Sequence, residues 1–99
     1  MKKVFISCPM NGKTDEEILE ARKRGTALAE KELKEPVEVI DSLFDPNDKP
    51  LKLLAKALDL LADADAAVFT KGWGSARGCV IEHTCAEKYG IGYVITEGN

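Results

Sequence analysis

Short apolar runs alternate along this chain with longer segments in which apolar residues recur every three or four positions. The first pattern is typical of buried strands and the second of amphipathic helices. They predict strands at residues 3–7, 37–41, 65–70 and 91–96, with helices at 15–34, 51–61 and 75–89 between them. Strands that alternate with helices pair in parallel, and their crossovers are right-handed. The alternation therefore predicts an α/β fold with three layers, three main helices and a parallel sheet in the order 2-1-3-4.

Local signals place the ends of the expected helices. Thr14 followed by Glu17 has the spacing of a capping box, and Pro36 closes the same helix. Asp48 is a candidate N-cap for the second helix and lies in a turn-rich loop at residues 45–50.

Each expected helix has one face that it can bury. On the first helix this face comprises Ile18, Ala21, Gly25, Leu28, Ala29 and Leu33, and on the second Leu51, Leu54, Leu58 and Leu61. On the third helix, which Gly90 ends, we expect most of the buried side to come from Val80, Ile81, Thr84 and Cys85.

The size and composition of the chain limit its function. Its 99 residues form one domain, 1–99, too short for a second core. A net charge of −3 with scattered lysines argues against nucleic acid as a partner. No apolar stretch approaches the roughly 20 residues that span a bilayer, and the N-terminus favours a strand over a signal peptide. Three cysteines without CxxC spacing indicate reduced thiols, so a cytoplasmic enzyme or small-ligand binder is expected.

Two unusual loops are expected to meet at one edge of the sheet. In the order 2-1-3-4 the switch point lies between the first and third strands, and open α/β sheets bind ligands there, outside the carboxyl ends of the strands. The loops that leave those two ends are residues 8–12 and 71–77. The crevice between them is the expected binding site.

The second of these loops carries most of the chain's chemistry. Residues 72–78 form a glycine-rich turn that opens a helix, a place where backbone N–H groups and the positive end of the helix dipole gather. Glu82 follows in the N-terminal part of that helix, where a carboxylate could orient or attack an electrophilic ligand. The same residue could also be an ordinary solvated helix glutamate.

Two neighbours of Glu82 have two interpretations each. Arg77 could clamp a phosphate or carboxylate, since a cation at a helix N-terminus opposes the dipole, or it could pair with a nearby Asp or a subunit. Trp73 could stack on a ligand ring or cover the core.

No cofactor or metal site is expected. Cys79 and His83 have a helical spacing that could bind a metal, but no further residue completes the ligand set, and a Cys–His nucleophilic pair has the same weakness. The glycines at 72, 74 and 78 lack the spacing of a dinucleotide fingerprint, which also belongs to the first strand–helix turn.

Taken together, the two loops resemble those of a specific family. The motifs are Val4-Phe5-Ile6-Ser7-x-Pro9-Met10-x-Gly12 and Gly72-Trp73-x-x-x-Arg77-Gly78-x-x-x-Glu82-His83, with Asp65-Ala-x-Val68 before the second. They look like those of the small bacterial and phage proteins grouped with the nucleoside 2-deoxyribosyltransferases, and the resemblance covers nearly the whole chain. It implies a flavodoxin-like, Rossmann-like sheet and cleavage or transfer at the N-glycosidic bond of a nucleoside or nucleotide.

The resemblance also implies roles for individual residues. Glu82 stands where the family has the nucleophile that attacks the anomeric carbon, next to an oxocarbenium-like transition state. The substrate contacts expected from the two motifs are Ser7, Pro9, Met10, Gly12, Trp73, Ser75, Arg77 and Gly78. Members of the family tend to complete their sites across a dimer, so a homo-oligomer is expected.

Three positions depart from the family pattern. Active members usually keep an Asp on the helix before the third strand, and Ala57 stands at that position, with Asp59 and Asp63 on other helix faces. Cys8 replaces a small glycine, and Ala76 takes the place of the serine in the glutamate turn. Leaving-group protonation contributes about two to four orders of magnitude, so a nucleotide-binding or sensing module that has lost turnover is the alternative function. A subunit of a larger assembly with a vestigial pocket is a third interpretation.

Overall fold

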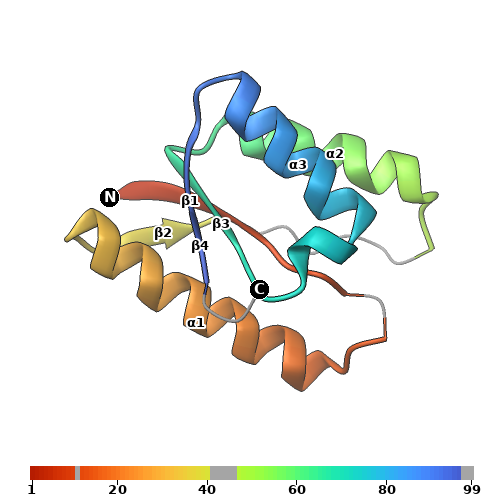
Figure 1. Cartoon of the computed structure of the whole chain (residues 1–99), viewed down its shortest axis with the longest axis horizontal. Coiled ribbons are helices and arrows are strands. Elements are labelled where there is room, and N and C mark those ends of the chain that lie inside the picture. The colour runs from red at the N-terminus through yellow and green to blue at the C-terminus, as the bar shows by residue number, and fades with distance from the viewer. Residues whose placement is uncertain (11, 41–46, 97–99) are drawn as a thin grey trace.

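Strands and helices alternate through the computed structural model of the chain, which describes residues 1–10, 12–40 and 47–96. In chain order the elements are β1 (Lys2–Ser7), α1 (Asp15–Leu33), β2 (Val37–Val39), α2 (Pro50–Ala62), β3 (Ala66–Phe69), the 3₁₀ turn η1 (Trp73–Ser75), α3 (Arg77–Lys88) and β4 (Gly92–Ile95). The strands form one parallel sheet in the order β2-β1-β3-β4 (Figure 1). The predicted α/β fold and strand order are confirmed.

The helices cover both faces of the sheet, and within the described residues none of them is long and apolar enough to cross a membrane. Figure 1 shows α1 on one face and α2 with α3 on the other. Along β1, Val4 and Ile6 pack on the α1 side, whereas Phe5 packs with α2 and α3. Because Ser7 is two residues beyond Phe5, its side chain points to the α2–α3 side.

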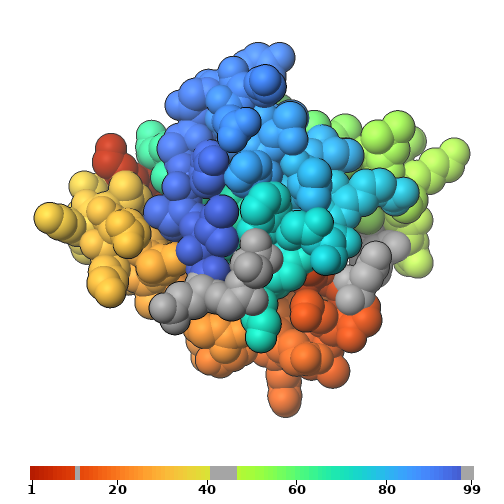
Figure 2. Space-filling view, in the orientation of Figure 1, coloured from red at the N-terminus to blue at the C-terminus, as the bar shows by residue number. Residues whose placement is uncertain are grey.

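The inner and outer strands differ in burial. The last four residues of β1 are buried, as are three of the four in β3, whereas every residue of the edge strands β2 and β4 is half-buried or exposed. Figure 2 shows β4 at the surface beside α3. Both inner strands therefore carry the continuous apolar burial expected of a parallel sheet that is covered on two faces.

One of the two predicted helix caps is present. Thr14 and Glu17 form the capping box, each side chain bonded to the other's backbone N–H. The prediction that Asp48 caps the second helix was wrong, because α2 begins with Pro50 and its N-cap is Lys49, which makes no side-chain cap bond. Asp48 lies one residue too early, and its carboxylate pairs instead with Lys56 at 2.6 Å.

The face of α2 that packs on the sheet is shorter than expected. Leu61 is buried, but Leu51 is 75% exposed because the N-terminal end of α2 extends beyond the sheet (Figure 1). Asp41, the predicted end of the second strand, and residues 45–46 of the turn-rich loop lie outside the described residues.

Gly25 lets α1 approach the sheet closely. A Cβ atom at this position would lie 3.2 Å from Val68 Cγ1 and 3.5 Å from methyl groups of Ile6 and Thr70. The position is buried, as the predicted apolar face of this helix requires. A larger side chain would push α1 away from the strands β1 and β3 that carry the site.

The substitution Gly25→Leu is expected to lower the free energy of unfolding by about 1–3 kcal/mol, the usual cost of overpacking a core. Ala27→Leu, on the exposed side of the same helix, is the matched control and should change it by less than about 0.5 kcal/mol. Urea denaturation followed by circular dichroism measures both. Equal midpoints for the two variants would contradict the close packing of α1.

Candidate active site

A cleft of about 770 Å³ opens between α2 and α3 at the carboxyl end of β1. Most of its lining is apolar, with Phe5 of β1 and Leu54 and Ala57 of α2 among the contributors. Such a shape and lining are typical of sites for small organic molecules. Its polar groups come from the side chains of Ser7, Arg77 and Glu82 and from the thiols of Cys8 and Cys79.

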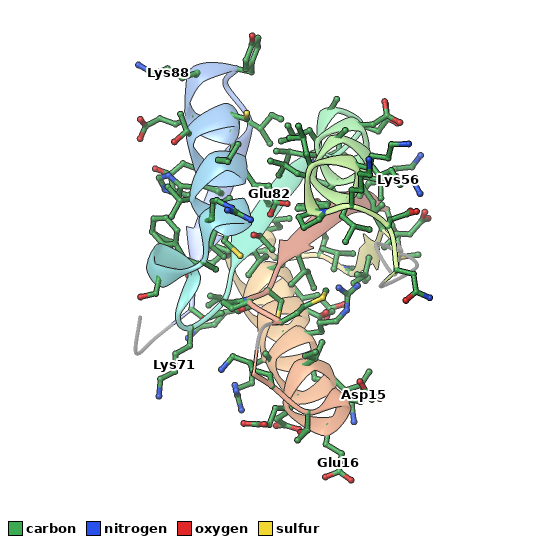
Figure 3. The ribbon with its side chains drawn as sticks, turned by 90° about the vertical axis from the view of Figure 1, so that its right-hand side faces the viewer. Asp15, Glu16, Lys56, Lys71, Glu82 and Lys88 are labelled. Carbon is green, nitrogen blue, oxygen red and sulfur yellow. The ribbon has the colours of Figure 1, made fainter. Side chains whose placement is uncertain are left out.

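Glu82 lies at the centre of this site. Its side chain is only 8% exposed, and Figure 3 shows it between α3 and α2, while the labelled charged residues Asp15, Glu16, Lys56, Lys71 and Lys88 project outward. Ser7 Oγ donates a hydrogen bond of 2.6 Å to Glu82 Oε1. Burial raises the pKa of the Glu82 carboxyl, and the Ser7 hydrogen bond lowers it in part. Glu82 is therefore not an ordinary solvated helix glutamate.

The orientation of α3 explains the burial of Glu82. The residues of α3 that face the sheet are Cys79, Glu82 and Ala86, spaced three and four apart. The expectation that Val80 and Thr84 supply the buried side was wrong, since both are exposed, while Ile81 and Cys85 are half-buried. Small side chains at 79 and 86 let α3 lie close to the strands, and this places the intervening carboxylate inside.

Cys79 lies one helical turn before Glu82 and faces the same cleft. Burial raises the pKa of its thiol to about 11, against a lowering by the Ser7 hydroxyl, and the nearby Glu82 and Cys8 raise it further. The thiol therefore stays protonated at neutral pH and is a poor nucleophile. This argues against the Cys–His nucleophilic pair.

A second cleft, of about 600 Å³, adjoins the first at the N-terminus of α3. Ala76, Arg77 and Gly78 line both clefts, and Pro9, Lys13, Gly72 and Ser75 line only the second. Pro9 of the loop 8–12 therefore meets Gly72 and Ser75 of the loop 71–77 at one cleft, as expected for the two loops. Lys13 and Arg77 make this second cleft the more basic of the two.

Trp73 lies in an aromatic cluster that covers the core. Its ring stacks on His83 with centroids 4.3 Å apart and lies 5.6 Å from Phe69, while Tyr93 meets His83 edge-on at 4.6 Å. Trp73 lines neither cleft, and its Nε1 is buried without a hydrogen-bond partner. The structure thus has the core-covering arrangement, and a contact between Trp73 and a ligand stays a prediction. His83 belongs to this cluster, whereas Cys79 faces the cleft. Among the described residues no group of three side chains could hold a metal ion.

The remaining predicted contacts divide between the two clefts. Met10, 46% exposed, lines the first, whereas the buried Pro9 and the exposed Ser75 line the second. Gly12 lines neither and has a φ of +73°, a backbone conformation that favours glycine. Their roles as substrate contacts stay predictions.

The sequence did not lead us to expect Lys13 or the leucines of α2 as lining residues of the clefts. Lys13 directly follows the first loop, so its position in the sequence was a usable signal. The apolar wall from Leu53 and Leu54 of α2 could have been found from the leucines that fall on more than one face of that helix. Leucines beyond the core-facing side indicate a surface that is hollowed or covered.

The chain was compared with models of protein families, with curated proteins and with solved structures, and none of the three comparisons found a match.

The buried Glu82 carboxylate is expected to lower the free energy of unfolding by an amount that depends on pH. A carboxyl whose pKa is raised by folding favours the folded state only while it is protonated, and that contribution is lost as pH rises through its folded pKa. Glu82→Gln should therefore raise the free energy of unfolding at pH 7 by about 0.5–2 kcal/mol. The gain should shrink as pH falls through the raised pKa of Glu82 and vanish below the ordinary carboxyl pKa. Urea denaturation across the pH range tests this, with the exposed Glu87→Gln as the control; a gain that does not depend on pH would contradict the burial.

Proposed function

We propose that this protein is an N-glycosidase or 2-deoxyribosyltransferase-like enzyme that acts on nucleosides or nucleotides with Glu82 as nucleophile. The observation that carries the proposal is the Glu82 carboxylate, buried, bonded to Ser7 and open to a 770 Å³ cleft at the carboxyl edge of the sheet. Buried acids with perturbed pKa values in a cleft are candidates for catalysis. The resemblance of both loop motifs to the nucleoside 2-deoxyribosyltransferases selects this chemistry over other uses of a carboxylate.

The reaction would proceed in two displacements at the anomeric carbon. The Glu82 carboxylate attacks that carbon while the C–N bond breaks, and the base leaves with the electron pair and takes up a proton from water. The product is an ester between Glu82 and the sugar. Water or a second base then attacks the same carbon, loses a proton to solvent, and releases Glu82 as a carboxylate. The first acceptor gives hydrolysis and the second gives transfer.

The surroundings of Glu82 fit an aromatic base attached to a sugar. The apolar wall from α2 offers a surface for a planar heterocycle, and the poorly solvated carboxylate is well placed to stabilise an oxocarbenium-like charge. Arg77 lines both clefts, so it would contact the sugar or a phosphate at the junction. No metal or organic cofactor is required by this scheme.

We further propose that the protein works as a homo-oligomer in the cytoplasm. Leu51 and Met10 form an exposed apolar rim on the cleft that a second copy would cover. All three cysteines are free thiols, which fits a reducing compartment.

The alternative function is a nucleotide-binding module without turnover. Ala57 lines the cleft beside Glu82, at the position where active relatives of this kind are expected to have an Asp. The basic second cleft favours binding of an anionic group whether or not a bond is broken.

The catalytic proposal predicts that Glu82→Ala lowers the rate of base release by at least about 10³-fold, because removal of a nucleophile abolishes the displacement. A panel of nucleosides and 5′-monophosphates, with free base followed by chromatography, provides the assay. Asp59→Asn, an exposed carboxylate on α2 that lines neither cleft, is the control and should keep full activity. Undiminished cleavage by Glu82→Ala would overturn the mechanism.

The alternative predicts tight binding of a 5′-monophosphate by calorimetry with no product. In either case Arg77→Ala should weaken binding of the monophosphate about tenfold or more and that of the matching nucleoside much less, because a charge-assisted bond is lost. Lys88→Ala, which removes a cation from the last turn of the same helix, is the control. Equal losses for nucleotide and nucleoside would contradict a phosphate contact for Arg77.

A further inference from the structure

The Ser7 side chain is held in a single place by the sheet. Ser7 pairs with Phe69 in the register between β1 and β3, and its carbonyl accepts hydrogen bonds from the backbone N–H of Thr70 at 3.0 Å and from Thr70 Oγ1 at 3.3 Å. The residue is only 2% exposed. Its hydroxyl therefore projects from a fixed backbone at the last position of β1.

That hydroxyl is already committed to Glu82. A serine hydroxyl has one hydrogen to donate, and in Ser7 it goes to Glu82 Oε1 at 2.6 Å, within the short range of a charge-assisted O–H···O bond. A substrate hydroxyl that accepted the same hydrogen would have to break this bond. While this bond is present, Ser7 cannot donate a hydrogen bond to a sugar oxygen.

The other carboxylate oxygen is free to act. Among the described residues no group is hydrogen-bonded to Glu82 Oε2, and Trp73 Nε1 is their one buried side-chain nitrogen or oxygen atom without a partner. Oε2 is therefore open to the cleft that Glu82 lines. One oxygen is anchored and one faces the space where a ligand would lie.

We propose that Ser7 is a positioning residue that fixes the Glu82 carboxylate by one oxygen and so selects Oε2 as the attacking atom. The attack by Oε2 on a substrate rests on the proposed function, whereas the hydrogen bond by which Ser7 fixes the carboxylate does not.

Removal of the anchor tests the proposal without any substrate. Ser7→Ala deletes one small polar atom and leaves the apolar packing of β1 intact. Carbon-13 NMR of the Glu82 carboxyl across a pH titration should show its pKa move upward in Ser7→Ala, since a bond to the ionised form is lost. Thr26→Val removes a half-buried hydroxyl on α1, across the sheet from Glu82, where it donates to the Arg22 carbonyl, and it should leave this pKa unchanged.

Activity provides the second readout. With a substrate that is cleaved, Ser7→Ala should lower kcat about 10- to 100-fold, the usual effect of one hydrogen bond to a charged group, while KM changes little. The acidic limb of the pH profile should move to higher pH, and Ser7→Thr, which keeps a hydroxyl, should restore most of the rate. A loss confined to KM would overturn the positioning role and return Ser7 to substrate binding.

The two proposals fail in different ways. If no nucleoside or nucleotide is cleaved, the glycosidase proposal fails while the NMR titration still decides whether Ser7 anchors Glu82. If the pKa of Glu82 is the same in the wild type and in Ser7→Ala, the anchoring fails, whatever the activity.

Discussion

The hydrogen bond between Ser7 and Glu82 is the interaction on which the site depends. A carboxylate on the face of a helix that packs against a sheet is unfavourable unless a partner satisfies it. Ser7 is that partner because period-two alternation along β1 turns it toward α3, and because the strand order places β1 beside β3. The chain that leaves β3 passes through the short turn η1 into α3, so the carboxylate and the hydroxyl, 75 positions apart, meet at one edge of the sheet.

The Ser7–Glu82 hydrogen bond also determines which groups line the cleft. Because Glu82 is held against β1, the space beside it is walled by α2, whose contribution is apolar apart from its backbone. The cations lie farther out, at Lys13 and Arg77, near the N-terminus of α3. On the proposed function, a ligand that fills both clefts would place its base against the apolar wall of α2 and an anionic group near Lys13 and Arg77. At Glu82 an acidic side chain lies on the core-facing side of a helix, against the usual pattern of polar residues outside. Such departures from the pattern are expected at functional sites.

The fold could be predicted from the sequence because its signals are local and agree with one another. The buried runs at 3–7 and 65–70, the Thr14–Glu17 box and the helical spacing between them leave few topologies open. The rotation of α3 could not be predicted, because ranking its residues by hydrophobicity assigned the buried side to Val80 and Thr84 and left open whether Glu82 is solvated. What decides the rotation is tertiary: small side chains at 79 and 86 permit close packing, and Ser7 on a distant strand satisfies the acid. The position of Trp73 could not be predicted from the sequence either, because its stacking on His83 depends on the rotation of α3.

The most direct test of the account is a search for a covalent intermediate on Glu82. Incubation with 2-fluoro-substituted nucleosides, whose fluorine destabilises the oxocarbenium-like transition state and so slows the breakdown of a glycosyl ester, should add the mass of the sugar to the protein. Peptide mass spectrometry should place that mass on Glu82, and Glu82→Gln should stay unmodified. Release of base by the wild type with no adduct, or an adduct on another residue, would contradict Glu82 as the nucleophile.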